Sequence, residues 1–188
     1  MSAGAPDAPR PRYDIEPFDP KKHDRTSFSC GVARLDNYLK RTAGKHQKGD
    51  FARVFAAVRT GERTVRGYYA MNAHAVEIGD LPAETTRRAP PRGVIPAAYL
   101  SMIAVDRSAQ GQGLGRILLA DALKRLIPVA DEIGIAVVIL DVIDDDDDGP
   151  EAFRRRISFY ERMGFRALPS RPSRMFLTLK DIRAAFCE

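Results

Sequence analysis

A glycine-rich turn between an apolar segment and an amphipathic helix constrains the fold of this chain more than any other feature. Residues 103–105 are apolar, and residues 106–110 are mostly polar. Gly111, Gly113 and Gly115 then occupy alternate positions where a helical pattern begins. The first N–H groups of a helix have no partner within the helix, and the helix dipole is positive there, so anions bind at such ends. The sequence therefore predicts a strand–turn–helix unit suited to a pyrophosphate.

Length and composition indicate one globular domain in a reducing compartment. The chain has 188 residues, of which 44% are hydrophobic, and no apolar run is long enough to span a membrane. Residues 1–12 lack the apolar segment of a secretory signal, so we expect a disordered tail there and a single domain over 13–188. Cys30 and Cys187 are far apart, which favours a cytoplasmic location. The net charge of +5 favours anionic ligands without choosing between coenzyme A and RNA.

Hydrophobic periodicity predicts an α+β fold of α/β character, with helices on both faces of a mixed sheet. A whole helix separates the apolar segments 97–105 and 136–140, so we expect these strands to be parallel. Pro128 predicts either a kink in that helix or two abutting helices, and Gly134 ends it. Residues 77–92 read as a long connection. The expected strands are 13–18, 51–60, 65–71, 97–105, 136–140, 165–168 and 174–179, and the expected helices begin near 32, 113, 151 and 180.

The glycine-rich turn also carries a family resemblance. Gln110, Gly113 and Gly115 match the (Gln/Arg)-x-x-Gly-x-(Gly/Ala) signature of the GCN5-related N-acetyltransferases (GNAT), which the chain resembles from Tyr13 to about Ile182. The resemblance implies a GNAT fold with splayed central strands and acetyl-CoA as cosubstrate. It also implies the cofactor contacts, which are the main chain of Ile103, Ala104 and Val105 and the turn residues Gln110, Gly111, Gln112, Gly113, Leu114, Gly115 and Arg116.

Two further segments are similar to the tRNA-acetylating toxins of bacterial toxin–antitoxin pairs. One runs from Phe28 to Leu39, with Phe-Ser-Cys-Gly followed by Leu-Asp-Asn-Tyr-Leu, and the other is Val65 to Tyr69. The resemblance implies acetylation of the amino group of an aminoacyl-tRNA and a ribbon-helix-helix antitoxin as partner. Because dimers are common in the family, we also expect a homodimer.

Tyr160 is the candidate general acid. It stands in Phe159-Tyr160, followed by Gly164-Phe165, which matches the family's Phe-Tyr-x-x-x-Gly-Phe. A phenol with an ordinary pKa of about 10 stays protonated at neutral pH and can donate its proton to a departing thiolate. The alternative is that both aromatic rings only pack one helix face, and we prefer it for Phe159.

The sequence leaves the general base unassigned. Glu161, Asp141 and His74 are candidates, but no pattern singles one of them out. In the resembled toxins no dedicated base is needed, because the α-amine of an aminoacyl ester is largely neutral.

Basic residues around the first helix are candidates for tRNA phosphate contacts. Phosphate contacts dominate the affinity of proteins for folded RNA, whereas a solvated helix face is the plainer explanation of the same charges. The candidates are Arg34, Lys40, Arg41 and Lys45.

The aspartate run Asp144 to Asp148, followed by Gly149, resembles the first half of a calcium loop. Arg155 stands where the closing glutamate would be, so we expect a solvated loop and no bound metal. The run is longer than the turn of the resembled toxins, which leaves open a small-molecule or protein amine as acceptor. A second alternative is a catalytically silent acyl-CoA-binding domain, against which Tyr160 and the intact turn argue.

Overall fold

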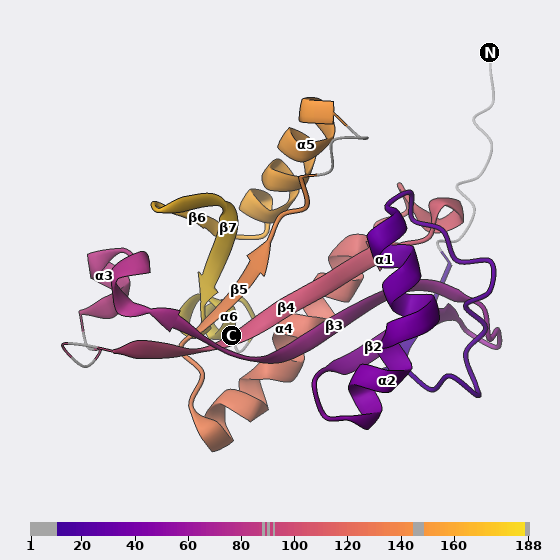
Figure 1. Cartoon of the computed structure of the whole chain (residues 1–188), viewed down its shortest axis with the longest axis horizontal. Helices are drawn as coiled ribbons and strands as arrows, with labels where there is room; N and C mark the ends of the chain where they lie inside the picture. Colours follow the sequence, from indigo (N-terminus) through magenta and orange to yellow (C-terminus); the bar gives the residue numbers. More distant parts are fainter. Residues whose placement is uncertain (1–10, 88, 90, 92, 145–148, 187–188) are drawn as a thin grey trace, which may run out of the picture.

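The strands form one mixed sheet. The computed structural model describes residues 11–87, 89, 91, 93–144 and 149–186. The sheet has 7 strands in the order β1-β2-β3-β4-β5-β7-β6 (Figure 1). Only β4 and β5 are parallel neighbours, as expected from the helix that connects them. The strands are β1 (Tyr13–Pro17), β2 (Arg53–Arg59), β3 (Val65–Glu77), β4 (Val94–Val105), β5 (Val137–Asp141), β6 (Arg166–Leu168) and β7 (Arg171–Thr178).

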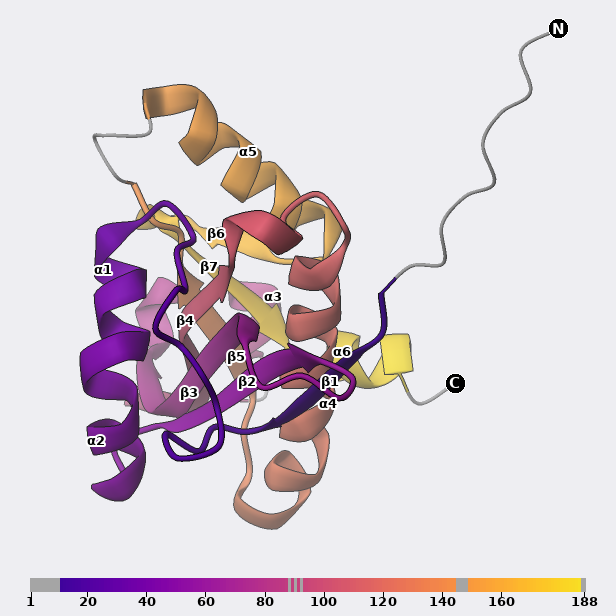
Figure 2. The ribbon, with the colours of Figure 1, turned by 90° about the vertical axis from the view of Figure 1, so that its right-hand side faces the viewer.

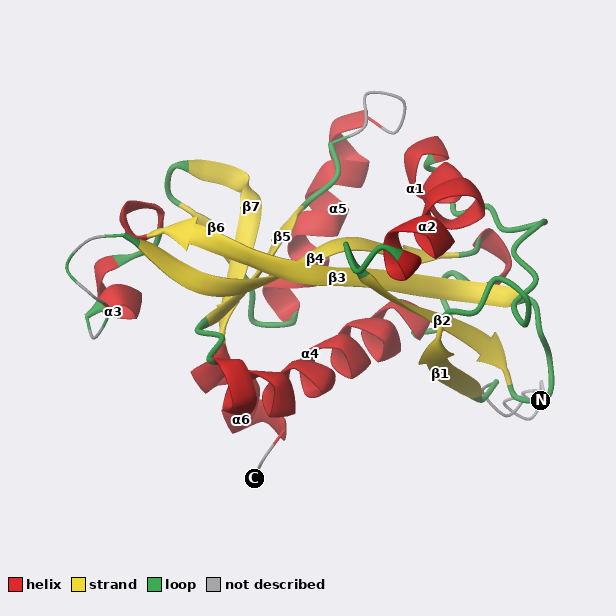
Figure 3. Cartoon of the chain, turned by 60° about the horizontal axis from the view of Figure 1, so that its bottom comes forward, coloured by secondary structure: helices red, strands yellow, loops and turns green. Residues whose placement is uncertain are grey.

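Helices cover both faces of the sheet, so the predicted GNAT-like arrangement is confirmed. The helices α1 and α2 lie on one face and α4 and α6 on the other (Figure 3). Seen from the end, α5 lies above the sheet between these two sides (Figure 2). The helical segments are α1 (Ala33–Asn37), the π-helical η1 (Tyr38–Thr42), α2 (Ala43–Lys48), η2 (Ile78–Asp80), α3 (Ala83–Thr86), η3 (Arg107–Ala109), α4 (Leu114–Ile133), α5 (Gly149–Arg162) and α6 (Leu179–Phe186).

One expectation needs correction and another is narrowed to one of its alternatives. Residues 77–92 are not only a connection, because β3 continues to Glu77 and α3 forms a helical turn at Ala83–Thr86. Of the two alternatives at Pro128, two abutting helices are excluded, since the single helix α4 continues past this residue and ends at Gly134, whose φ is 70°. Pro128 lacks an N–H, but the apolar side chains on either side of it keep one face of α4 on the sheet.

The sheet separates the buried apolar side chains into a larger cluster on the α4 side and a smaller one on the side of α1 and α2. Leu118, Leu119 and Leu123 of α4 pack on one face, whereas Phe28, Leu39 and Tyr68 pack under α1 and α2 on the other. In the described part of the chain, no helix combines the length and apolar character that crossing a membrane requires. The expected tail lies at residues 1–12, of which 1–10 are outside the described part.

Gly67 marks the closest approach of β3 to α4. A Cβ atom there would lie 2.8 Å from Leu118 Cδ1 and 3.2 Å from the carbonyl oxygen of Ala104. We expect Gly67→Ala to lower the free energy of unfolding by about 1–3 kcal/mol through overpacking, measured by urea denaturation. Gly79→Ala is the control, because its Cβ meets nothing within 4 Å and should change stability by less than about 0.5 kcal/mol. Equal effects of the two substitutions would contradict this packing.

Candidate functional site

The site begins where β4 and β5 separate. The two strands pair only from Ala97–Val137 to Tyr99–Ile139. Beyond this point β4 continues to Val105 along β3, and β5 ends at Asp141. The edge of β4 that faces away from β3 is therefore open over residues 100–105, as expected for splayed central strands.

A β-bulge at Ser101 shapes this edge. Ala70 pairs with Met102 and Met71 with Leu100, so Ser101 is the extra residue, and its hydroxyl donates a hydrogen bond to the Ala70 carbonyl (3.2 Å). Leu100 packs on the α4 side and Met102 on the α1 side, although strict alternation would place them on one face. Bulges re-aim side chains beside functional sites, and this one changes which face each later residue of β4 occupies.

The main chain of β4 turns alternately toward β3 and toward the open edge. The N–H of Asp106 donates to the carbonyl of Arg66 in β3 (2.8 Å), so Ala104 also faces β3. Ile103 and Val105 therefore direct their N–H groups into the gap. This corrects part of the sequence expectation, because Ala104 presents no free main-chain group to a ligand there.

The glycine-rich turn leaves several N–H groups uncovered at the end of this gap. Gly111 and Gly113 have φ values of 75° and 84°, and a Cβ at either position would meet nothing within 4 Å. The N–H groups of residues 111–115 have no hydrogen-bond acceptor among the described residues. They lie at the N-terminus of α4, where the helix dipole favours an anion.

Side-chain hydrogen bonds tie this turn to the segment 28–39. The amide of Gln110 donates to the carbonyls of Val105 and Cys30, both at 3.0 Å. Asp106 accepts from the N–H of Ser29 (2.8 Å), and Asp36 accepts from the N–H of Cys30 (2.8 Å). Partial burial acts to raise the pKa of Asp106, but hydrogen bonds from Ser108 and Ser29 lower it overall, so the carboxylate stays ionised. Gln110 therefore shapes the turn through its side chain.

Tyr160 closes the other end of the gap. It lies on α5, half-buried, with its ring in edge contact with Phe159 and Phe165. It lines a cavity of about 130 Å³ together with residues 100–103 of β4 and Leu140 of β5. Burial raises the pKa of Tyr160 to about 12, although the charge of Arg156 opposes this. The hydroxyl is therefore protonated throughout the physiological range.

None of the three candidate bases is placed to deprotonate an amine. Asp141 borders the cavity, but Arg174 binds it in a bidentate ion pair (2.8 and 2.7 Å) and Tyr99 donates to it (2.9 Å). The hydrogen bonds from Arg174 lower the pKa of Asp141 despite its partial burial, which makes it a weak base. Glu161 and His74 are exposed and line none of the cavities next to Tyr160.

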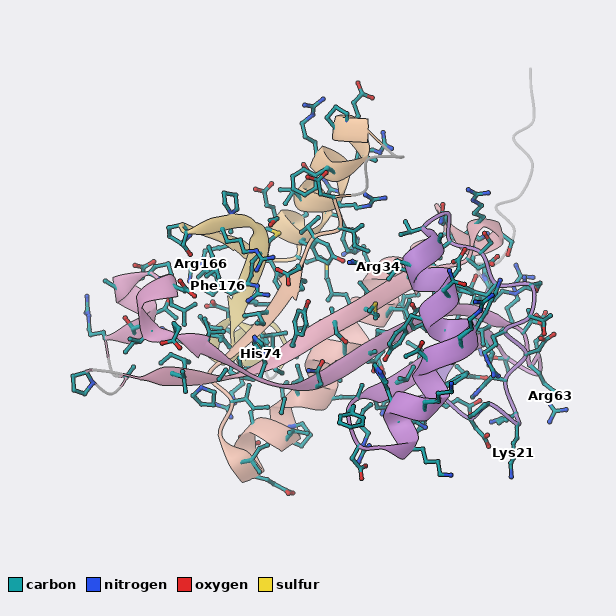
Figure 4. All side chains as sticks on the ribbon, in the orientation of Figure 1. Lys21, Arg34, Arg63, His74, Arg166 and Phe176 are labelled. Carbon is teal, nitrogen blue, oxygen red and sulfur yellow. The ribbon has the colours of Figure 1, made fainter. Side chains whose placement is uncertain are left out.

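The predicted basic residues do not all lie at the site. Arg34 projects from the side of α1 that faces α5 (Figure 4) and lines a cavity of about 500 Å³ beside Asp141. Lys40, Arg41 and Lys45 lie farther along η1 and α2 and line neither this cavity nor that of Tyr160. The site is also bordered by Arg171, Ser101 and Tyr99. The sequence gives no signal for these residues, because β7 and the bulge join the site only through strand pairing.

The possible metal ligands remain separate. In residues 11–87, 89, 91, 93–144 and 149–186, no three His, Cys, Asp or Glu side chains come together as a metal site would require. Asp145 to Asp148 and Cys187 lie outside the described residues, so the expected solvated loop stays a prediction.

Comparison with known proteins places this geometry in a family. Residues 52–167 match the acetyltransferase (GNAT) domain. A probable toxin TacT of Sinorhizobium fredii is 46% identical over 170 residues, covering 90% of this chain and 93% of the relative. A tRNA-acetylating toxin of Mycobacterium tuberculosis is 36% identical over 162 residues, covering 86% of this chain and 89% of the relative.

Solved structures agree with the sequence relatives. AtaT complexed with acetyl-methionyl-tRNAfMet superimposes with a TM-score of 0.80 at 26% identity, covering 93% of this chain and 99% of AtaT. AtaTR bound with AcCoA gives a TM-score of 0.76 at 27% identity, covering 93% and 98% of the two chains. Both therefore share the overall fold over nearly the whole chain.

The ion pair at the separation point generates a stability prediction. We expect Asp141→Asn to lower the free energy of unfolding at pH 7 by about 1–3 kcal/mol, because Arg174 loses its charged partner. The lowered pKa means that wild-type Asp141 stabilises the fold above its ordinary pKa of 3.8 and loses this contribution as pH falls through the lowered value. Urea denaturation from pH 3 to 7 should therefore show the difference between variant and wild type shrinking toward low pH. If the difference in unfolding free energy between variant and wild type stayed constant over this pH range, the stabilising role of the ionised Asp141 carboxylate would be contradicted.

Proposed function

Because the chain belongs to the GNAT acetyltransferase family, we propose that it transfers the acetyl group of acetyl-CoA to the amino group of an aminoacyl-tRNA. The observation that carries this proposal is the single gap between β4 and β5, with an anion-binding turn at one end and the Tyr160 hydroxyl at the other. A relative named as a tRNA-acetylating toxin, matched over 89% of its length, supports the acceptor, and a second relative is named as a probable toxin.

The chain's own groups suit acetyl-CoA. The uncovered N–H groups of residues 111–115 would hold the pyrophosphate, with Arg116 beside them in the first turn of α4. The open N–H groups of Ile103 and Val105 would bind the pantetheine and the thioester oxygen. A preorganised donor aimed at a developing oxyanion contributes about 3–4 kcal/mol to catalysis.

The reaction then needs few further groups. The neutral amine attacks the thioester carbonyl, and collapse of the tetrahedral intermediate breaks the C–S bond and releases the coenzyme A thiolate. Tyr160 donates its proton to that thiolate, and the amide nitrogen loses a proton to solvent. An α-amino ester is largely neutral near pH 8, so the absence of a well-placed base among the described residues fits such an acceptor better than a lysine side chain, whose pKa is about 10.4.

The proposed biological role is that of a translation-blocking toxin held by an antitoxin. Arg34 beside the cavity and Lys40, Arg41 and Lys45 farther along η1 and α2 would contact tRNA phosphates. The proposal includes a cytoplasmic location, a ribbon-helix-helix antitoxin and a homodimer. The complexes of AtaT with acetyl-methionyl-tRNAfMet and of AtaTR with AcCoA support tRNA and acetyl-CoA as the ligands of this chain.

A pair of glycine variants tests the cofactor turn. Gly113→Ala adds a methyl group where the pyrophosphate would lie, at a φ of 84° that strains the backbone. We expect the Kd for coenzyme A, measured by calorimetry, to rise about tenfold or more, which corresponds to roughly 1.4 kcal/mol. Gly61→Ala is a matched control, with a φ of 83° and equally open surroundings in the turn between β2 and β3. If Gly61→Ala weakens binding equally, the turn is not the coenzyme site.

Tyr160→Phe tests the function itself. Wild-type protein incubated with labelled acetyl-CoA and total charged tRNA should yield N-acetylated aminoacyl-tRNA. The variant should lower kcat by about 10²- to 10⁴-fold, because general acid catalysis is lost, while its Kd for coenzyme A stays unchanged. Because the pKa of Tyr160 is about 12, kcat/KM of the wild type should rise with the deprotonation of the amine and show no alkaline loss below pH 10.

Two outcomes would count against the proposal. Labelling of free amines or protein lysines with no labelling of charged tRNA would show that the acceptor is wrong. A Tyr160→Phe variant with wild-type kcat would show that the proton comes from another group.

A further inference from the structure

Three cavities meet at Ser101 of the β4 bulge. The first is the Tyr160 cavity, the second is a polar cavity beside Arg34 and Arg171, and the third is an aromatic cavity under α2. Ser101 lines all three cavities. We propose that they bind the three substituents of the α-carbon of the acceptor, so that the enzyme selects aminoacyl-tRNAs with uncharged, apolar side chains. This inference rests on the proposed function.

The first cavity would receive the reacting amine. It contains the Tyr160 ring and β4 residues 100–103, and its volume of about 130 Å³ leaves little space for groups other than the amine and the acetyl thioester. The amine must therefore stand close to the bulge, at the junction with the other two cavities.

The polar cavity suits the ester and the terminal nucleotide. It has a volume of about 500 Å³ and is bordered by Arg34 of α1 and Arg171 of β7. Neither arginine is in a salt bridge of the described residues, although the charge of Arg171 also helps to lower the pKa of Asp141. Its acidic members are Asp144 and Asp141, and Asp141 is neutralised by Arg174. Guanidinium groups without an ion-pair partner bind phosphates well. The Tyr99 ring is already packed against His74 (5.3 Å between ring centroids) and Arg174 (5.9 Å), so the two arginines carry the phosphate binding of this cavity.

The aromatic cavity differs from it in charge. It has a volume of about 420 Å³ and is lined by Tyr38, His46, Phe51, Asn72, Tyr99 and Met102, with Ala52 and Ser101 completing the wall. None of these described residues is an Asp, Glu, Lys or Arg, so a charged side chain bound there would lose its hydration without gaining a partner. Phe51 is 72% exposed, which leaves an apolar surface that a substrate side chain would cover.

The presence of three cavities favours one class of acceptor amine over another. The α-carbon of an aminoacyl ester carries an amine, an ester and a side chain, and each would enter one cavity. The terminal amine of a lysine or a polyamine has one substituent and would leave a cavity empty. The junction at Ser101 therefore favours an α-amine over a terminal amine.

The test measures which amino-acid side chains of the aminoacyl-tRNA the enzyme prefers. It then asks whether an isosteric substitution in the aromatic cavity changes that preference. Wild-type enzyme is given acetyl-CoA and individual tRNAs charged with leucine, isoleucine, methionine, phenylalanine, glycine, aspartate, glutamate, lysine or arginine. We expect kcat/KM for at least one of the four large apolar residues to exceed that for glycine and the charged residues by about 10- to 100-fold. Asn72→Asp, which places a carboxylate in the aromatic cavity, should lower the preference for apolar over basic side chains about tenfold.

Asn37→Asp is the matched control. Asn37 is exposed on α1 and borders none of the three cavities. The Asn37→Asp substitution adds the same negative charge as Asn72→Asp, on the helix that carries the proposed tRNA contact Arg34. It should change kcat/KM for all aminoacyl-tRNAs by the same factor. Equal shifts in preference with both variants, or a wild type without side-chain preference, would overturn the inference and leave tRNA acetylation intact. A wild type that acetylates no aminoacyl-tRNA would overturn both.

A second pair of variants tests the polar cavity. Arg171→Ala should lower the ratio of kcat/KM for aminoacyl-tRNA to that for the methyl ester of the same amino acid about tenfold, because only the tRNA has phosphates. Arg63→Ala removes an equal charge far from the junction (Figure 4) and should leave the ratio unchanged. An unchanged ratio in Arg171→Ala would overturn the assignment of this cavity.

Discussion

The separation of β4 from β5 after Tyr99 and Ile139 is the constraint on which the site depends. Parallel strands normally bury all their main-chain groups, so leaving one edge open costs stability unless a ligand occupies it. The ion pair of Asp141 with Arg174, joined by Tyr99, marks the last point before the strands diverge. In the proposed function, cofactor binding, proton donation and acceptor binding all use the space created beyond it.

A second set of contacts fixes one wall of that space. The turn at Ser29 and Cys30 is bound by Asp36 from α1 and by Asp106 and Gln110 from the end of β4. These contacts bring together the segment 28–39 and the glycine-rich turn, which are far apart in sequence. The glycine-rich turn is thereby linked to α1, which carries Arg34, and through α1 to η1, which begins at Tyr38. These two residues border the cavities proposed for the acceptor.

Local features of the site could be predicted from sequence, and those that depend on strand pairing could not. The turn 110–116 carries its own information, because glycines and an adjoining helix suffice to indicate an anion site. The bulge at Ser101 has no signal in sequence, since it arises only from the register between β3 and β4. For the same reason Ala104 was assigned to the cofactor although its main chain faces β3, and Arg171 was missed although it borders the acceptor. The mixed fold was predictable from the order of its strands and helices, whereas the length of β3 and the continuity of α4 through Pro128 depend on tertiary packing.

The bulge connects the chemistry with the choice of acceptor. By turning Ser101 and Met102 to the same side, it opens the α1 face of β4 next to the amides that we propose to face acetyl-CoA. A regular strand would keep these functions on different faces, and the attacking amine could then reach the thioester without meeting a surface that senses its other substituents. Because Ser101 lines both the cavity proposed for the amine and the cavity proposed for the side chain, a side chain that fits poorly would displace the amine itself. Selectivity of this kind acts on kcat as well as on KM, since misplacement by about 1 Å can cost about 100-fold in rate.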